Sequence, residues 1–219
     1  MRVFSAAAVA LVAMVAATDA QALTIHRSPF LLNPDLQVGF EAATAATSHS
    51  EAGVSITYVG TPHVDGIWTT SQAAEGKQSW YANGGGFGYT RVQFQSAIRT
   101  LQFAAGSGWP PGGGAQSPNP HLQFRLLNDG AILTEGVAGP VRHFGRFRVF
   151  GFSGLSFDEV HLQSLNGDTP FNPGGFDALA LDALAAGGSI IPEPATWAML
   201  ILGFGLVGAR ARQQRRAAA

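Results

Sequence analysis

The chain has 219 residues, a net charge of −1 at pH 7 and no cysteine. Charged residues make up only 12% of it and Lys77 is its one lysine, so it lacks the basic face with which proteins bind nucleic acid. Without cysteine it has no disulfide, no thiolate metal site and no cysteine nucleophile. The 28 glycines and 12 prolines favour many turns and few long helices.

Residues 1–22 have the pattern of a secretory signal peptide. Arg2 gives a positive start, an apolar run follows from 3 to 17, and Ala20-Gln21-Ala22 matches a small-x-small cleavage site. We predict an N-terminal signal helix that directs export through the Sec machinery, so that the mature chain begins at Leu23. A buried N-terminal helix is the alternative.

Residues 23–185 are predicted to form the folded body. Val54, Ile56 and Tyr58 alternate with polar residues, as in a strand with one buried face. The same period of two recurs, separated by turn residues, at 92–94, 98–103, 122–126, 147–149, 157–162 and 178–184. Asn128-Asp129-Gly130 is typical of a hairpin turn. The pattern predicts an all-β fold of about eight or nine short strands, an antiparallel β-sandwich that is jelly-roll-like.

Two loops rich in glycine and proline interrupt this body, at 83–88 and 106–120. After the last predicted strand, residues 186–191 are predicted to be a linker. It separates the body from a C-terminal segment of different composition.

That C-terminal segment, residues 192–216, combines a stiff motif, an apolar run and a basic tail. The prolines of Pro192-Glu193-Pro194 favour an extended backbone. As a helix, the uncharged run 195–209 would extend about 22 Å, which is short for a bilayer core of about 30 Å. The tail 210–216 carries Arg210, Arg212, Arg215 and Arg216. We predict a short transmembrane helix whose arginines stay in the cytoplasm and leave the body outside; a buried core helix followed by a solvated tail is the alternative.

The stretch from Pro192 to Met199, followed by Gly203-Phe204-Gly205 and the arginines, resembles the PEP-CTERM sorting signal in its PEPxxWA form, with Trp197 and Ala198 at the fixed positions. The resemblance implies an exported Gram-negative protein with an inner-membrane precursor. An exosortase would cut it near the Pro-Glu-Pro motif and send the body to the cell surface or the extracellular space. Such proteins usually accompany exopolysaccharide gene clusters, and most have no known enzymatic activity.

Signatures of catalysis are weak in the body. Gly151-Phe152-Ser153-Gly154 lacks the last glycine of a nucleophile elbow, and the six histidines form no H-E-x-x-H motif. We predict that the protein is not an enzyme. The alternative is a polysaccharide hydrolase, which needs two carboxylates about 5–9 Å apart across a groove. Asp158 and Glu159 are adjacent, so on a strand they would point to opposite faces.

A structural calcium site is the one cofactor that the sequence suggests; none is required for the predicted role. Glu41 lies on an early predicted strand, and Asp177 and Asp182 lie in or beside the last one. Oxygen ligands at the two ends of the body would suit Ca²⁺ and would tie the termini together. Asp182 pointing to solvent is the alternative.

Aromatic residues beside turns are the candidate ligand-binding groups. The flat rings of Trp80, Tyr81 and Trp109 would stack on sugar rings, and the amide of Asn83 would bond their hydroxyls. The alternative for Trp68 and Trp80 is packing in the core.

Together these patterns predict an exported surface or matrix protein that is structural or glycan-binding, with exopolysaccharide as a candidate partner. A secreted hydrolase and an adhesive matrix protein without a small-ligand site are the alternatives.

Overall fold

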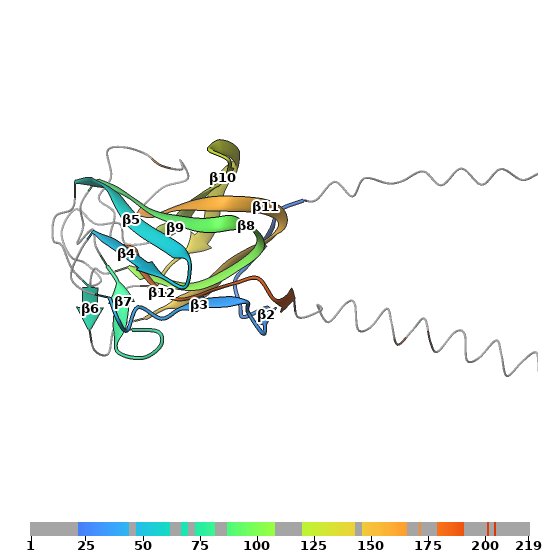
Figure 1. Ribbon diagram of the computed structural model, residues 1–219, viewed down its shortest axis with the longest axis horizontal. Helices are drawn as coiled ribbons and strands as arrows, with labels where there is room; N and C mark the ends of the chain where they lie inside the picture. Colours follow the sequence, from blue (N-terminus) through green and yellow to red (C-terminus); the bar gives the residue numbers. More distant parts are fainter. Residues whose placement is uncertain are drawn as a thin grey trace, which may run out of the picture.

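The computed structural model describes residues 22–43, 47–61, 67–69, 73–81, 87–107, 120–142, 146–165, 171, 179–190, 201 and 204. Apart from Ile201 and Phe204, which are helical, the regular structure in these ranges is β, and the strands pair antiparallel (Figure 1). The all-β, antiparallel prediction is confirmed. The jelly-roll connectivity and the two terminal helices stay predictions.

The strands are β1 (Thr24–His26), β2 (Leu31–Leu32), β3 (Leu36–Val38), β4 (Ser48–Glu51), β5 (Val54–Thr61), β6 (Ile67–Thr69), β7 (Gln78–Trp80), β8 (Phe87–Ser107), β9 (His121–Asn128), β10 (Ala131–Pro140), β11 (Arg148–Leu165), β12 (Leu179–Ala186) and β13 (Ser189–Ile190).

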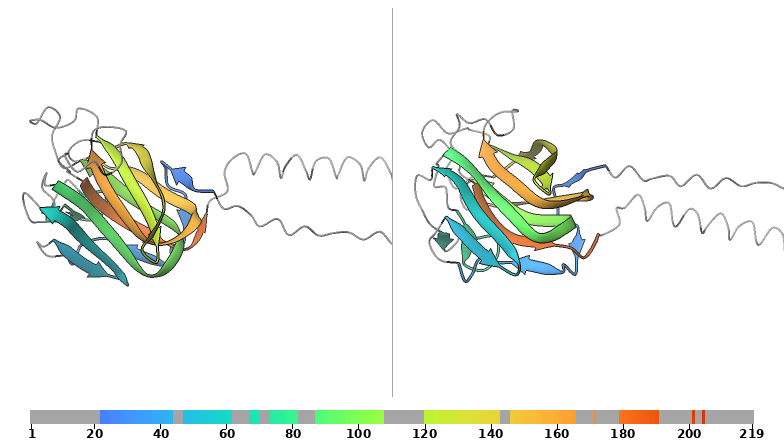
Figure 2. Two further views of the ribbon diagram at one scale, coloured as in Figure 1. Left: turned by 90° about the horizontal axis from the view of Figure 1, so that it is seen from above. Right: turned by 45° about the horizontal axis from the view of Figure 1, so that its top comes forward.

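Two long strands, β8 with 21 residues and β11 with 18, run through the whole body. The first half of β8 pairs with β5 and its second half pairs with β12. The first half of β11 pairs with β1 and its second half pairs with β9. The register between β8 and β11 shifts between Ser153 and Glu159, where both strands bend. One hydrogen-bonded sheet therefore folds over into two layers (Figure 2).

The two layers share β8 and β11 and differ in their other strands. We call the layer with strand order β10-β9-β11-β8-β5-β4 the first layer. The second layer has the order β1-β11-β8-β12. In it β3 and β7 lie along the far edge of β12, and β6 pairs with β7.

The core lies between the layers. Phe124 from the first layer and Phe152 from the second have ring centroids 4.7 Å apart. Each large side chain buried in this way stabilises the fold by about 1.5–3 kcal/mol. The largest side chains that are fully buried are Trp80, Phe40, Phe103, Phe150, Phe152, Phe157, Ile56, Leu101, Leu122, Leu126, Leu162 and Leu179.

The predicted hairpin at Asn128-Asp129-Gly130 connects β9 to β10. Asn128 pairs with Ala131, so the loop has two residues. Asp129 and Gly130 have φ values of 50° and 75°. Positive φ at both central positions is the geometry of a type I′ turn, whose twist matches that of the flanking strands.

The prediction of only short strands was wrong. The segments 92–94 and 98–103 belong to β8, and 147–149 and 157–162 belong to β11. Alternation identified the strands correctly, because a buried face repeats every second residue in either layer. It did not reveal that one strand continues through a bend from one layer to the next.

The prediction of a linker at 186–191 also needs correction, because most of this segment packs on the body and pairs with it. Ala186 is buried, the Gly187 N–H donates to the Thr100 carbonyl over 3.1 Å, and the Gly188 N–H donates to Asp35 Oδ2 over 2.9 Å. β13 then pairs with β2. Local composition suggested a free segment, but the backbone of β2, the Thr100 carbonyl of β8 and the Asp35 carboxylate hold it.

The predicted signal peptide lies outside the described residues except for Ala22, and the sorting segment 192–216 except for Ile201 and Phe204. These two residues have exposed fractions of 70% and 76%, so neither side chain packs into the body. Across the ranges described above, no helix has the length and apolar character needed to cross a membrane.

Candidate functional site

The outer face of the first layer is polar. Most residues that point inward from its strands are apolar, whereas most of those that point outward are polar and meet in rows across the strands. One row runs Thr57, Arg91, His161, Arg125 and Glu135. A second runs Ser55, Gln93 and Glu159, and Gln163 pairs with Gln123 in a third. We call this set of residues, together with Tyr89, the polar face.

Hydrogen bonds join the middle of the polar face. Glu159 accepts from Gln93 Nε2 over 2.6 Å and from His161 Nε2. Because the carboxylate accepts, Nε2 of His161 carries the hydrogen, and Nδ1 of the neutral ring is an acceptor. Burial lowers the pKa of His161 below its ordinary 6.5, against the opposing effect of Glu159, so the neutral ring is favoured at pH 7.

Two aromatic rings border this network. The Tyr89 ring lies 4.4 Å from the His161 ring between centroids. Phe171 meets Tyr89 edge-on at 5.8 Å, and its ring lies 4.4 Å from the Arg125 guanidinium carbon. The Phe171 N–H also donates to Gln123 Oε1 over 2.8 Å. The polar groups are thus enclosed on one side by ring surface.

Three buried polar atoms of this face have no hydrogen-bond partner among the residues that the structure describes: Arg91 Nε, His161 Nδ1 and Gln163 Oε1. His161 is 6% exposed and Gln163 is 3% exposed. Buried polar groups are nearly always paired, and an unpaired one costs about 1–3 kcal/mol. One donor and two acceptors left open beside each other form a set that hydroxyl groups match, because a hydroxyl both donates and accepts.

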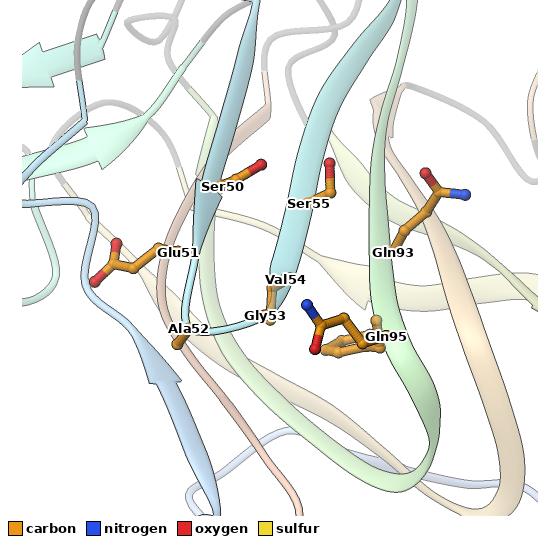
Figure 3. A pocket seen from close by; sticks show the side chains of 9 residues that line it. Ser50, Glu51, Ala52, Gly53, Val54, Ser55, Gln93 and Gln95 are labelled. Carbon is orange, nitrogen blue, oxygen red and sulfur yellow. The ribbon is translucent and has the colours of Figure 1, made fainter.

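A groove of about 470 Å³ opens at the β4–β5 end of the polar face. In Figure 3 the side chains of Ser50, Ser55 and Gln93 stand on three neighbouring strands, with Gln95 below them. The polar side chains are mostly hydroxyls and uncharged amides. Because Gln93 also binds Glu159, the groove is connected by hydrogen bonds to His161.

The aromatic residues predicted to stack on sugars lie elsewhere. Trp80 is fully buried, and its Nε1 donates to Thr90 Oγ1 over 3.3 Å. Tyr81 is 6% exposed and packs with Ala180 and Phe147. Neither ring offers a free face, so for Trp80 the core-packing alternative is the right one. Asn83 and Trp109 lie outside the described residues, and the side chain of Trp68 is not described.

The predicted calcium ligands hold a loop. Asp182 Oδ2 accepts from the N–H groups of Ala74 and Glu75 over 2.6 and 2.9 Å. Glu41 Oε1 accepts from the next pair, Lys77 and Gln78, over 2.7 and 3.0 Å. Among the residues that the structure describes, no three potential metal-ligating side chains converge. Asp177 lies outside them, so calcium binding stays a prediction.

The pKa values of the two carboxyl groups shift in opposite directions, and the causes differ. The N–H groups of Lys77 and then Gln78 hold the pKa of Glu41 below its usual value. Burial raises the pKa of Asp182, although three N–H groups oppose this effect.

Sequence reasoning missed the polar face. The signal was present in the strands: Arg91, Gln93, His161 and Gln163 occupy the positions that alternate with buried residues. A solvated face would carry the same residue types. Only the pairing of β5, β8, β11 and β9 brings them together.

Comparison with known proteins gives two findings. Residues 191–216 match the family model for the PEP-CTERM protein-sorting motif, so the predicted C-terminal signal is confirmed. Such a motif implies export and an exosortase as the processing partner. A solved structure of a family 29 carbohydrate-binding module mutant is similar at 12% identity with a TM-score of 0.33, over 77% of this chain and 94% of that one. No curated protein matches the sequence.

Proposed function

We propose that this chain, which carries a PEP-CTERM sorting motif, is an exported glycan-binding protein without catalytic activity. An exosortase cuts the membrane-anchored precursor near Pro192-Glu193-Pro194, and a jelly-roll-like body acts at the cell surface or in the exopolysaccharide matrix. The polar face of the first layer is its binding site.

The unpaired atoms of the polar face carry this proposal. A sugar presents several hydroxyls on one side and C–H groups on the other. Its hydroxyls match three atoms that lack partners among the described residues: the acceptors His161 Nδ1 and Gln163 Oε1 and the donor Arg91 Nε. Because these atoms are buried in the free protein, the side chains that cover them must move aside when the sugar binds. The rings of Tyr89 and Phe171 supply apolar surface beside them.

The groove supplies a place for further sugar units. Its hydroxyl and amide side chains suit uncharged hydroxyl groups, and Gln93 belongs both to the groove and to the polar face. A polysaccharide chain bound along it would therefore contact Ser50, Ser55 and Gln93 before it reaches His161.

The hydrolase alternative finds less support. It needs two converging carboxylates, one of them with a raised pKa to act as the acid. Among the described residues, the carboxyl whose pKa is raised is Asp182, which belongs to β12 in the second layer and accepts three backbone N–H groups. Glu159 of the polar face is bound by Gln93 and His161. We therefore propose binding alone.

Affinity electrophoresis of the purified full chain through gels containing neutral polysaccharides tests the proposal. We expect Gln93→Ala and His161→Phe to raise Kd roughly 3- to 10-fold each, since one lost hydrogen bond is worth about 0.5–1.5 kcal/mol. Gln37→Ala, an exposed glutamine of β3 in the second layer, is the matched control and should bind like the wild type.

Melting temperatures of all three variants show that they fold. If no polysaccharide retards the wild-type chain, or if Gln37→Ala weakens binding as much as Gln93→Ala, the polar face is not a glycan site and the scaffold interpretation is the better one.

A further inference from the structure

One end of the body, where β8 and β11 bend between the layers, holds both ends of the folded chain; we call it the bend end. Thr24 at the start of β1 pairs with Ser153, which pairs with Thr100. The N–H of Gly187, just before β13, donates to the Thr100 carbonyl. In Figure 1 the blue start and the red end of the described body lie at this end.

The distance from this end to the predicted transmembrane helix is short. β13 ends at Ile190, and the apolar run begins at Ala195. Five residues reach at most about 17 Å even when fully extended. In the membrane-anchored precursor the bend end is therefore held close to the bilayer surface.

The exposed apolar side chains of the body lie at or beside the same end. Among the described residues before 191, the large hydrophobic residues with exposed side chains are Leu32, Ile132 and Leu133, at 45%, 56% and 44%. Leu32 pairs with Ser189, directly beside residues 191–194, which connect the body to the predicted transmembrane helix. We call residues 191–194 the tether. Ile132 pairs with Leu127.

Register places Ile132 near the bend. Leu127 pairs with Glu159, two residues beyond Phe157 in the bend of β11. Ala131, Ile132 and Leu133 are consecutive and all exposed, directly after the Asp129-Gly130 turn. We call residues 131–133 the apolar tip. Contiguous exposed apolar residues, such as the three of the apolar tip, often mark a contact surface, whereas single ones such as Leu32 do not by themselves.

We propose that the bend end rests on the bilayer in the anchored precursor, with the apolar tip and Leu32 in the lipid interface. The tip protrudes on a hairpin instead of lining a groove, which suits insertion among lipids better than docking of a partner chain. The proposal depends on the predicted span at 195–209 and is independent of glycan binding.

The contact is built to be temporary. Three apolar side chains give weak membrane affinity by themselves, since even a single acyl chain binds a bilayer only marginally. While the tether holds the body, its high local concentration at the surface keeps the tip in contact. After cutting, the body leaves.

The absence of cysteine makes a direct test possible. Leu32→Cys, Ile132→Cys, Leu133→Cys and Thr61→Cys each take one environment-sensitive fluorophore, and each full chain is reconstituted into phosphatidylcholine vesicles containing headgroup-nitroxide lipid. Thr61 is the matched control. It is exposed and pairs with Phe87 at the end of the body opposite to the bend end. We expect several-fold stronger lipid quenching at positions 132 and 133 than at position 61.

Position 32 reports the tether itself. The proposal is overturned if the fluorophore at position 32 is quenched while those at positions 132 and 133 are quenched no more than the one at position 61. The tether would then approach the bilayer without the tip. If the fluorescence of labels at positions 132 and 133 changes only when exosortase is added, the apolar tip contacts a protein partner. That result overturns the proposal as well. Because the quencher is on lipid, contact between two copies of the chain does not imitate the expected result.

Discussion

Glu41 and Asp182 each accept from two consecutive backbone N–H groups that lead into β7: Asp182 from Ala74 and Glu75, and Glu41 from Lys77 and from Gln78, the first residue of β7. Backbone donors inside or beside a fold need such acceptors, so two acids replace the ladder there. Gly76 lies between the two anchored pairs with a φ of +62°. A Cβ at this position would lie 2.1 Å from Glu41 Oε1.

We expect Gly76→Ala to lower the free energy of unfolding by about 1–2 kcal/mol, the cost of a left-handed conformation for a residue with a Cβ. The added carbon also displaces the Glu41 carboxylate from the loop. Thermal unfolding measures the loss. Gly39→Ala is the control, because a Cβ there meets nothing within 4 Å, and an equal loss in both variants would contradict the anchoring role of Glu41.

Glu41 also makes a pH-dependent contribution to stability. Its folded-state pKa lies below the ordinary 4.5, so its stabilising effect is complete above that value and is lost as pH falls through the folded pKa. Asp182 acts in the opposite sense, since its raised pKa favours the folded state more at low pH. We therefore expect Glu41→Gln to reduce the difference in melting temperature between pH 7 and pH 4, measured by circular dichroism.

The control is Glu75→Gln, an exposed acid on the same loop. A full wild-type difference in Glu41→Gln would show that the bonds from Lys77 and Gln78 contribute nothing to acid sensitivity.

The strands β8 and β11 hold the two layers together, because one half of each strand belongs to the first layer and the other half to the second. Their shared pairing makes the two layers one hydrogen-bonded unit, so neither layer can separate without breaking a continuous strand. Between the layers, Phe152 contacts Phe124 with ring centroids 4.7 Å apart, and within the second layer it contacts Phe103 at 5.9 Å. The Phe152 ring is therefore part of the contact between the layers, within a core that also contains many aliphatic side chains.

We expect Phe152→Ala to lower the free energy of unfolding by about 3–5 kcal/mol, the usual result of removing a buried aromatic ring. Urea denaturation measures it. Ile132→Ala is the matched apolar control and should change stability by less than about 0.5 kcal/mol, because its side chain is 56% exposed. Similar losses in the two variants would show that the layers do not depend on the ring contact.

In the whole molecule, folding brings the processing region to the edge of the body. β13 pairs with β2 directly before the sorting motif, which begins at residue 191. In the function proposed above, an exosortase would therefore meet the motif beside a folded surface.

We expect replacement of Pro192-Glu193-Pro194 by three alanines to leave an uncut precursor in the membrane fraction, because the change removes the two prolines of the motif at which we propose the exosortase acts. Immunoblots of membrane and culture supernatant measure the two forms. Gln213→Ala with Gln214→Ala, between the arginines of the tail, is the control and should be processed normally. Normal secretion of the alanine variant would refute the role of the motif.

Local pattern was enough for the features that depend on near neighbours. The alternation in 54–58 predicts a strand, Asp129-Gly130 predicts a tight turn, and the order of residues from Pro192 to Arg216 identifies the sorting motif. In each case the physical cause lies within a few residues: side chains alternate along a strand, glycine tolerates positive φ, and proline restricts the backbone.

Only the tertiary structure decided which residues meet. Trp80 is in the core and not at a binding surface, and Glu41 and Asp182 anchor one loop from 36 and 108 residues away. The polar face likewise joins residues of β5, β8, β9 and β11. Burial and hydrogen bonding between residues far apart in the chain depend on strand order and register, which a single sequence determines only through the folded whole.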